Sequence, residues 1–149
     1  MSRIRAPRVL RGRTKLRTFK PENNDEWFEF RRQHLTSTEV ASLHRNRTAR
    51  NWQELREQKE SGERWGGNQF TEWGTAREPI LAPLFADIDS RLDYNADPQT
   101  IIINPDDERL CGTPDLFSAD GAVIGEIKTS KHPFAGGEFH DWCPDQYYL

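Results

Sequence analysis

GTPDLFSADGAVIGEIK, residues 112–128, predicts two apolar strands joined by a short polar turn. Asp115 lies on the first of these strands, and Glu126 and Lys128 lie on the second. Residues two apart in a strand face the same side of a sheet, so Glu126 and Lys128 project together. The turn folds the strands onto each other and brings Asp115 across to the same spot. We therefore expect two carboxylates and a lysine at one place on the sheet.

Two carboxylates beside a lysine form a set that can hold a divalent cation and a water molecule. Mg²⁺ takes oxygen ligands and binds through one or two carboxylates, substrate phosphate and waters. The carbonyl of Ile127, between Glu126 and Lys128, offers a further oxygen. A bound metal lowers the pKa of its water and places that water for attack on phosphorus. Lys128 can orient this water, help remove its proton or stabilise charge on the phosphate. The cluster predicts a metal-dependent nuclease that uses Mg²⁺ or Mn²⁺.

The alternative interpretation of the same residues is a surface hairpin with a Glu–Lys pair across one face. Such pairs are common, and a string of this kind also arises by chance. Here the two acids stand among glycine, proline and apolar strand residues instead of in a run of charges. This setting favours the metal site.

The composition indicates one domain with a compact core. The chain has 149 residues, of which 34% are hydrophobic and 30% charged, and five Trp and eight Phe can supply much of the buried area. Residues 1–20 carry eight Arg or Lys and no acid, which leaves 13 basic and 24 acidic residues, a net charge of −11, in 21–149. We expect a basic arm over 1–20 and a nuclease domain over 21–149. The arm either contacts nucleic-acid phosphates or forms a solvated tail.

Sequence periodicity predicts helices in the first part of the chain and strands in the second. Thr36 and Glu39 fit a capping box, which marks the start of the second helix. The predicted helices cover about 25–34, from 35 onward, 49–60 and 70–87, and the predicted strands cover 100–103, 109–117 and 122–129.

The fourth predicted helix contains two prolines. Pro79 and Pro83 each remove a backbone donor, so we expect a kink or a split into two pieces. Its apolar residues at helical spacing predict a buried stripe, made of Trp73, Ile80, Leu81, Leu84 and Phe85.

The chain resembles the PD-(D/E)xK nuclease superfamily, and within it the lambda-exonuclease-like or YqaJ-type viral recombinase family. The resemblance covers about residues 25–149 and implies an α/β restriction-endonuclease-like fold, with helices around a short mixed sheet and an α-β-β-β-α-β-type core. Three ordered segments carry it: Arg31 with Leu35-Thr36-Ser37-Thr38-Glu39-Val40, then Gly74-Thr75-Ala76-Arg77-Glu78-Pro79, then Gly112-Thr113-Pro114-Asp115 with Gly125-Glu126-Ile127-Lys128-Thr129-Ser130.

The resemblance assigns roles to the residues that match its motifs. Asp115 and Glu126 match the metal-binding acids, Lys128 matches the catalytic lysine, and Glu78 matches a helix-borne acid that completes the metal site. Without the resemblance, Glu78 is an exposed helical charge.

A phosphate pocket is implied by the first motif. Arg31 matches a basic residue of a DNA 5′-phosphate pocket, and Thr38, beside Ser37, matches a hydroxyl residue at a helix start. Helix N-termini offer free amides and a positive dipole end to anions. Plain helix capping is the alternative for Ser37 and Thr38. Lys131 either contacts the DNA backbone or is solvated.

By resemblance, the activity is that of a Mg²⁺-dependent phage-type exonuclease, which digests one strand of duplex DNA from the 5′ end during recombination. A single-strand-annealing protein is the implied partner, and family members form toroidal trimers. Two alternatives remain: a DNA-end-binding module with weak or no turnover, and another repair nuclease of the same superfamily.

No apolar run approaches the roughly 20 residues that span a bilayer, and no signal segment follows Met1. We expect a cytoplasmic protein, in the host cytoplasm if it is phage-encoded, with Cys111 and Cys143 reduced and a disulfide as the alternative. The family pattern continues past the lysine into a Gln-bearing helix. Residues 142–149 resemble its lead-in, so we expect the C-terminal helices to be lacking.

Overall fold

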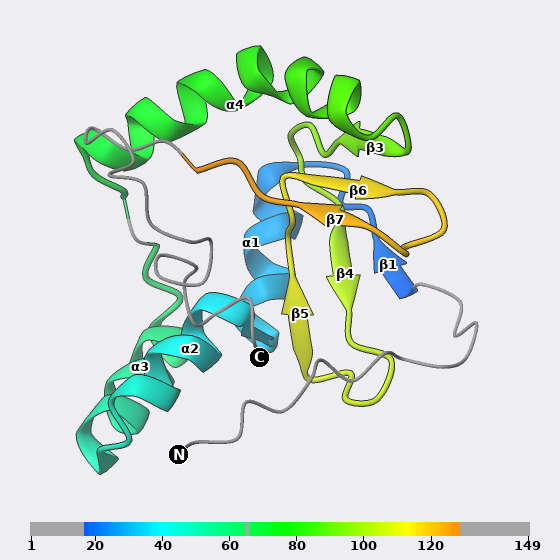
Figure 1. Ribbon diagram of the computed structural model, residues 1–149. Coiled ribbons are helices and arrows are strands. Elements are labelled where there is room, and N and C mark those ends of the chain that lie inside the picture. Colours follow the sequence, from blue (N-terminus) through cyan, green and yellow to red (C-terminus); the bar gives the residue numbers. More distant parts are fainter. Residues whose placement is uncertain (1–16, 65, 129–149) are drawn as a thin grey trace, which may run out of the picture.

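The computed structural model of the chain describes residues 17–64 and 66–128. These residues form four helices and two small sheets (Figure 1). The helices are α1 (Asn24–Gln33), α2 (Ser37–Arg45), α3 (Ala49–Ser61) and α4 (Gln69–Ile88). The strands are β1 (Arg17–Phe19), β2 (Leu35–Thr36), β3 (Leu92–Tyr94), β4 (Ile101–Ile103), β5 (Leu110–Gly112), β6 (Leu116–Ser118) and β7 (Ile124–Gly125).

One sheet is mixed and the other is antiparallel. The first has the order β1-β4-β5-β2, in which β2 runs parallel to β5 and the other neighbours are antiparallel. The second has the order β3-β6-β7. In Figure 1, α4 lies across the top beside β3, while α2 and α3 lie at the lower left. The expected α/β class, with helices beside a mixed sheet, is confirmed. The restriction-endonuclease-like core stays a prediction.

Local capping defines the first three helices, and all three predicted helices are present. α2 begins at Ser37 instead of residue 35, because Leu35 and Thr36 form β2. The Asn23 side chain accepts from the first turn of α1, and the Thr48 side chain does the same for α3. At α2 the capping box is complete. The Glu39 N–H donates to Thr36 Oγ1 at 3.3 Å, and the Thr36 N–H donates to Glu39 Oε2 at 2.8 Å. α3 ends at Gly62, whose φ of 68° is the left-handed conformation that favours glycine.

Of the two expectations for the fourth helix, a kink or a split, the split does not occur, because α4 continues through both prolines. The helix follows a curved path in Figure 1. Most of its predicted buried stripe is also wrong. Trp73, Ile80 and Leu84 are 55%, 71% and 57% exposed. The side of α4 that faces the fold carries Ala82, with the half-buried Leu81 and Phe85 beside it. Glu78 precedes these residues by three, four and seven positions and so lies on the same side.

The predicted strand over 109–117 is wrong as a single element. It is divided between β5 and β6, which belong to different sheets, and Thr113, Pro114 and Asp115 lie between them. Pro114 has no N–H with which to continue a ladder, which explains the break.

The last predicted strand and the basic arm also differ from expectation. β7 is shorter than the predicted 122–129, so Glu126 and Lys128 follow the strand instead of lying on it. The end of the predicted arm over 1–20 is part of the fold, because β1 pairs with β4. Residues 1–16 and 129–149 lie outside the described residues, and so does the predicted lead-in to a C-terminal helix.

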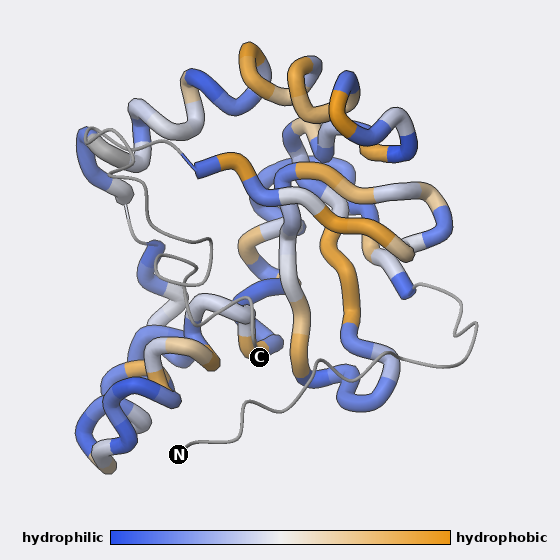
Figure 2. Tube along the Cα trace, viewed as in Figure 1, coloured by the Kyte–Doolittle hydropathy of each residue, from blue (hydrophilic) through white to orange (hydrophobic). Residues whose placement is uncertain are grey.

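The main core lies between α4 and the β3-β6-β7 sheet. Its buried members are Ala82, Leu92, Leu116 and Ile127. A Cβ at Gly125 would come within 3.2 Å of the Leu116 side chain, so β7 packs closely on this core. Figure 2 shows apolar residues in the strands and in the half of α4 next to β3, whereas α3 is mostly hydrophilic. No helix in the described ranges combines the length and apolar character needed to cross a membrane.

Candidate active site

Asp115 lies where the chain passes from one sheet to the other. The residue is 7% exposed, and its Oδ2 accepts a hydrogen bond of 2.6 Å from the Ile127 N–H. This bond joins the segment before β6 to the segment after β7. It therefore holds the Asp115 carboxylate against the stretch that carries Glu126 and Lys128.

Glu126 and Lys128 form a direct pair beside this bond. Nζ of Lys128 donates to Oε2 of Glu126 at 3.0 Å. Burial raises the pKa of Glu126 above its ordinary value, and the nearby Asp115 carboxylate raises it further, while Lys128 lowers it. Hydrogen bonding with the Asp115 side chain also raises the pKa of Glu126. The three residues that the sequence motif predicted to meet are therefore brought together.

Glu78 reaches the same region from α4. Burial raises the pKa of Glu78, and the charges of Asp115, Asp97 and Glu126 raise it further, while Lys128 opposes them. Glu78 is thus within electrostatic reach of the cluster. In residues 17–64 and 66–128, however, no three His, Cys, Asp or Glu side chains are arranged to hold a metal ion. The metal-binding role of Glu78 stays a prediction.

The donor chemistry of the cluster fits a hard divalent cation. The carboxylates of Asp115 and Glu126 are oxygen ligands of the kind that Mg²⁺ and Mn²⁺ prefer. Burial and mutual repulsion disfavour the charged form of Glu126 in the protein alone. A bound cation would offset this repulsion. The Ile127 N–H donates to Asp115, and the carbonyl of the same residue is the oxygen that Ile127 could contribute to a cation.

The residues predicted to bind a 5′-phosphate lie beside the same loop. The β2–β5 register pairs Thr36 with Cys111, so Ser37 begins α2 next to Gly112. A Cβ at Gly112 would be 3.9 Å from Ser37 Oγ. Thr36 supplies the hydroxyl that caps α2, and the exposed Ser37 and Thr38 follow it in the first turn. The capping alternative for Ser37 and Thr38 is therefore wrong.

Arg31 approaches the loop from α1. Its Nη1 donates to Thr113 Oγ1 at 2.7 Å, and its guanidinium lies 4.1 Å from the centre of the Trp27 ring. Burial lowers the pKa of this guanidinium, which nevertheless stays charged. Arg31 thus contacts Thr113, and Ser37 lies close to the adjacent Gly112. Both of these residues shortly precede Asp115.

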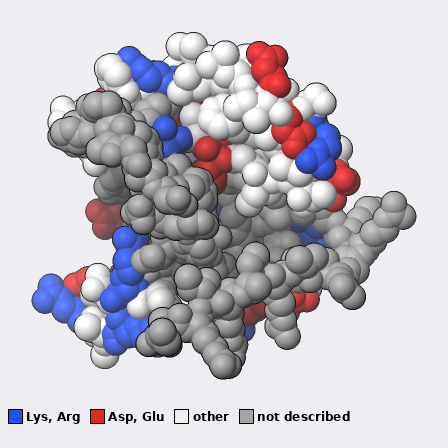
Figure 3. Space-filling view, viewed as in Figure 1, with Lys and Arg blue, Asp and Glu red and all other residues white. Residues whose placement is uncertain are grey.

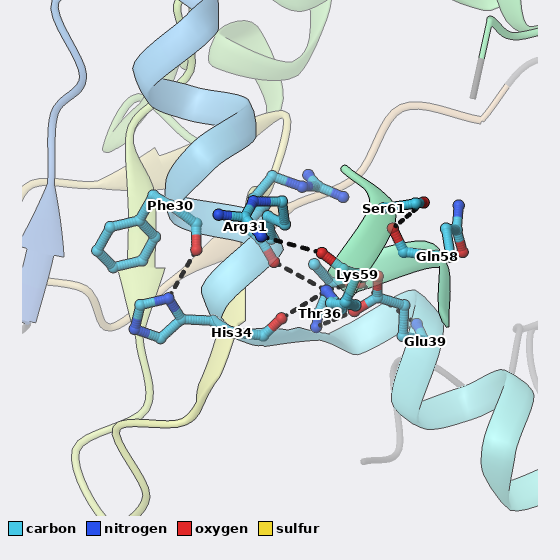
Figure 4. Close-up of polar contacts among 9 residues, drawn as sticks. Phe30, Arg31, His34, Thr36, Glu39, Gln58, Lys59 and Ser61 are labelled. Carbon is cyan, nitrogen blue, oxygen red and sulfur yellow. Dashed lines mark hydrogen bonds and ion pairs between the residues drawn. The ribbon is translucent and has the colours of Figure 1, made fainter. Parts of the chain in front are cut away.

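Lys59 of α3 links α1 and α2, which carry Arg31 and Ser37 (Figure 4). No pattern in the sequence predicts this link. Its Nζ donates to the carbonyls of Arg31 at 2.8 Å and His34 at 2.6 Å, at the end of α1. The same Nζ lies 2.8 Å from Oε1 of Glu39, the capping-box acid of α2. Lys59 therefore fixes the end of α1 relative to the start of α2.

Two further features concern charge and aromatic residues. Figure 3 shows Lys and Arg side chains at the lower left, over α2 and α3, and Asp and Glu at the upper right. Trp73 is exposed on α4 with Arg77 stacked 3.0 Å from its ring centre. Cys111 is buried and free. Lys131 and Cys143 lie outside the described residues.

The family model of the YqaJ-like viral recombinase domain matches residues 26–149. The match spans Arg31, the start of α2, Glu78 and the Asp115–Lys128 cluster. Comparison with curated proteins gave no match, and neither did comparison with solved structures.

Proposed function

We propose that this chain, which belongs to the YqaJ-like viral recombinase domain family, is a metal-dependent exonuclease that acts on duplex DNA ends in recombination. Membership of this nuclease-related family supports the reaction class. The observation that carries the proposal is the meeting of Asp115, Glu126 and Lys128 around the 2.6 Å bond from the Ile127 N–H. Buried carboxylates beside a lysine are suited to a metal-assisted hydrolysis.

Asp115 and Glu126 would hold the cation, Mg²⁺ or Mn²⁺, with the Ile127 carbonyl and Glu78 as further ligands. The bound cation supplies Lewis acidity toward a phosphate oxygen and lowers the pKa of water. Lys128 would stabilise negative charge on the phosphate or orient the attacking water, since its Nζ already lies 3.0 Å from Glu126 Oε2.

The 5′-phosphate of a DNA end would bind at Arg31, Ser37 and Thr38. A cationic side chain beside a helix N-terminus is a favourable anion site. This pocket borders Gly112 and Thr113, and the chain reaches Asp115 two residues after Thr113. A terminal phosphate held there would place the next phosphodiester toward the carboxylates. This proximity supports digestion from the 5′ end.

Further parts of the proposal rest on the resemblance. They are a partner protein that anneals single strands, a ring-shaped trimer, a DNA-backbone contact at Lys131 and a location in the host cytoplasm. The basic residues of 1–20 provide an additional contact for phosphates.

Duplex DNA labelled separately on each strand tests the reaction and its polarity. One duplex carries 5′-phosphates and the other 5′-hydroxyls, and each is incubated with Mg²⁺ or with EDTA. We expect Mg²⁺-dependent release of nucleotides from the 5′ ends, fastest on the phosphorylated duplex. Release that begins at the 3′ ends would contradict the polarity. Tight binding of the phosphorylated ends without release in Mg²⁺ or Mn²⁺ would contradict the enzyme and support an end-binding module.

A further inference from the structure

Asn95 is a buried amide that binds the backbone immediately behind Asp115. The residue follows β3 and is 3% exposed. Its Nδ2 donates to the carbonyls of Pro114 and Thr100, each at 2.9 Å, and its Oδ1 accepts from the Thr100 N–H at 2.7 Å. Its own N–H donates to the Asp115 carbonyl at 2.8 Å. Both the side chain and the backbone of Asn95 thus hold the Pro114–Asp115 segment.

The Pro114–Asp115 segment is not part of a strand. β5 ends at Gly112 and β6 begins at Leu116, in different sheets. Pro114 lacks an N–H, so it cannot donate to a neighbouring strand. The last pair of the β3–β6 ladder is Tyr94 with Leu116, and Asn95 extends the contact by one residue.

A buried amide is unfavourable unless all of its hydrogen-bonding groups find partners. At Asn95 both side-chain polar atoms are engaged, and one of these bonds ends next to Asp115. The Asp115 carboxylate in turn accepts from the Ile127 N–H. Asn95, Asp115 and Ile127 therefore form a continuous path from the loop after β3 to the segment that carries Glu126.

We propose that Asn95 is a positioning residue for the metal site, which fixes the Pro114–Asp115 backbone so that the Asp115 carboxylate faces Ile127 and Glu126. The proposal rests on the proposed function, because it concerns the cation that these carboxylates would bind. Groups that orient metal ligands in this way typically change metal affinity by about 10- to 100-fold when they are replaced.

The test compares Asn95→Asp with a matched variant, Asn104→Asp. At Asn95 the change keeps the acceptor for the Thr100 N–H but points an oxygen at the carbonyls of Pro114 and Thr100. Asn104 lies in the turn before β5, and its Oδ1 accepts from the N–H groups of Asp106 and Asp107 at 2.8 and 3.0 Å. Asn104→Asp keeps both of these bonds and lies at the other end of β5 from Asp115.

Two measurements are made on each variant and on the wild-type chain. Hydrogen exchange of the Ile127 amide in metal-free protein measures how well its bond to Asp115 is maintained. Calorimetric titration with Mn²⁺ measures the affinity for the cation. We expect Asn95→Asp to lower the protection of this amide and the Mn²⁺ affinity by about tenfold or more. Asn104→Asp should leave both within about twofold, since its bonds are retained. An added carboxylate alone would strengthen cation binding, so weaker binding reports lost positioning.

Unchanged Ile127 protection and unchanged Mn²⁺ affinity in Asn95→Asp would overturn the proposal, even if the variant melts at a lower temperature. If Asn95→Asp does not fold, Asn95→Ser replaces it, because a hydroxyl keeps one donor and should give a smaller loss of the same two quantities. A wild-type chain that binds no Mn²⁺ would instead overturn the proposed function. In that case the exchange of the Ile127 amide still decides whether Asn95 positions Asp115.

Discussion

The Asp115 carboxylate accepts its 2.6 Å hydrogen bond from the Ile127 N–H at the point where the β6–β7 ladder ends. The last ladder pair is Leu116 with Gly125, so Asp115 and Glu126 are the next residues outward on the two strands. A side-chain bond to the backbone takes the place of a further ladder bond. This relationship sets the two acids side by side while leaving the following residues outside the sheet.

Replacing Asp115 separates its structural role from its chemical one. Asp115→Asn keeps an oxygen that accepts from the Ile127 N–H, whereas Asp115→Ala removes it. In urea denaturation, the free energy of unfolding of the alanine variant should therefore be about 2 kcal/mol lower than that of the asparagine variant. Both variants should lose cleavage by about 100-fold or more, because neither offers a carboxylate to the cation. Equal stability of the two variants would contradict the role of the bond.

The raised pKa of Glu126 gives the metal-free protein a specific pH dependence. Because the pKa in the folded protein lies above the ordinary value of 4.5, Glu126 contributes stability that is complete below pH 4.5. That contribution is lost as the pH rises through the folded-state pKa. Urea denaturation of Glu126→Gln should show a smaller loss of stability between acid and neutral pH than the wild type. Mn²⁺ should restore the stability of the wild type at neutral pH, since the cation binds the ionised form of Glu126.

The same slope with pH in the wild type and in Glu126→Gln would contradict this account. Glu29→Gln serves as the control. Its carboxylate is fully exposed, and hydrogen bonds from Arg32 and Gln33 lower its pKa to about 2, which is a shift in the opposite direction. The stability that Glu29 contributes is therefore complete above pH 4.5 and is lost only as the pH falls toward 2. Glu29→Gln should leave the slope of stability between pH 4.5 and neutral pH unchanged.

Arg31→Lys tests the 5′-phosphate pocket. Lysine keeps the charge but cannot both stack on Trp27 and donate to Thr113 through a planar group. We expect affinity for a 5′-phosphorylated duplex to fall by about tenfold in the presence of EDTA, in fluorescence anisotropy. Affinity for the 5′-hydroxyl duplex should change little. The exposed Arg47, changed to lysine, is the matched control. An equal loss for both duplexes would show that Arg31 does not recognise the terminal phosphate.

Lys59→Met tests the link between α1, α2 and α3. The change keeps a long apolar side chain but leaves two carbonyls and the Glu39 carboxylate without their cation. The free energy of unfolding should fall by about 2 kcal/mol. Arg56→Met removes a pair that is mostly exposed on both sides, so it should lower the free energy of unfolding much less than Lys59→Met. Similar losses for the two variants would contradict the linking role of Lys59.

Local signals predicted the helices better than the strands. The Thr36–Glu39 capping box lies within four residues of sequence, and it defines the start of α2 as expected. The break in the predicted strand 109–117 depends on Pro114 and on Asn95, which is 19 residues earlier. Contact with β3 determines which side of α4 is buried. The apolar pattern of α4 alone does not predict this side.

The residues of the candidate site also differ in how far the sequence predicts them. Asp115, Glu126 and Lys128 follow a short motif, and their meeting was predictable from one hairpin. Asn95 and Lys59 act through bonds to remote backbone groups, and a single asparagine or lysine in a sequence has no spacing that reveals such a partner. These supporting residues required the fold.

The most direct test of the metal-dependent nuclease is the rate of nucleotide release from a 5′-phosphorylated duplex by the wild type, Glu126→Gln and Lys128→Met, with Mg²⁺ or with EDTA. Each protein is used at an equal concentration of folded chain, checked by its melting curve. We predict release by the wild type with Mg²⁺, none with EDTA, and a loss of about 100-fold or more in both variants. Release in EDTA, or release by Glu126→Gln at the wild-type rate, would contradict the account.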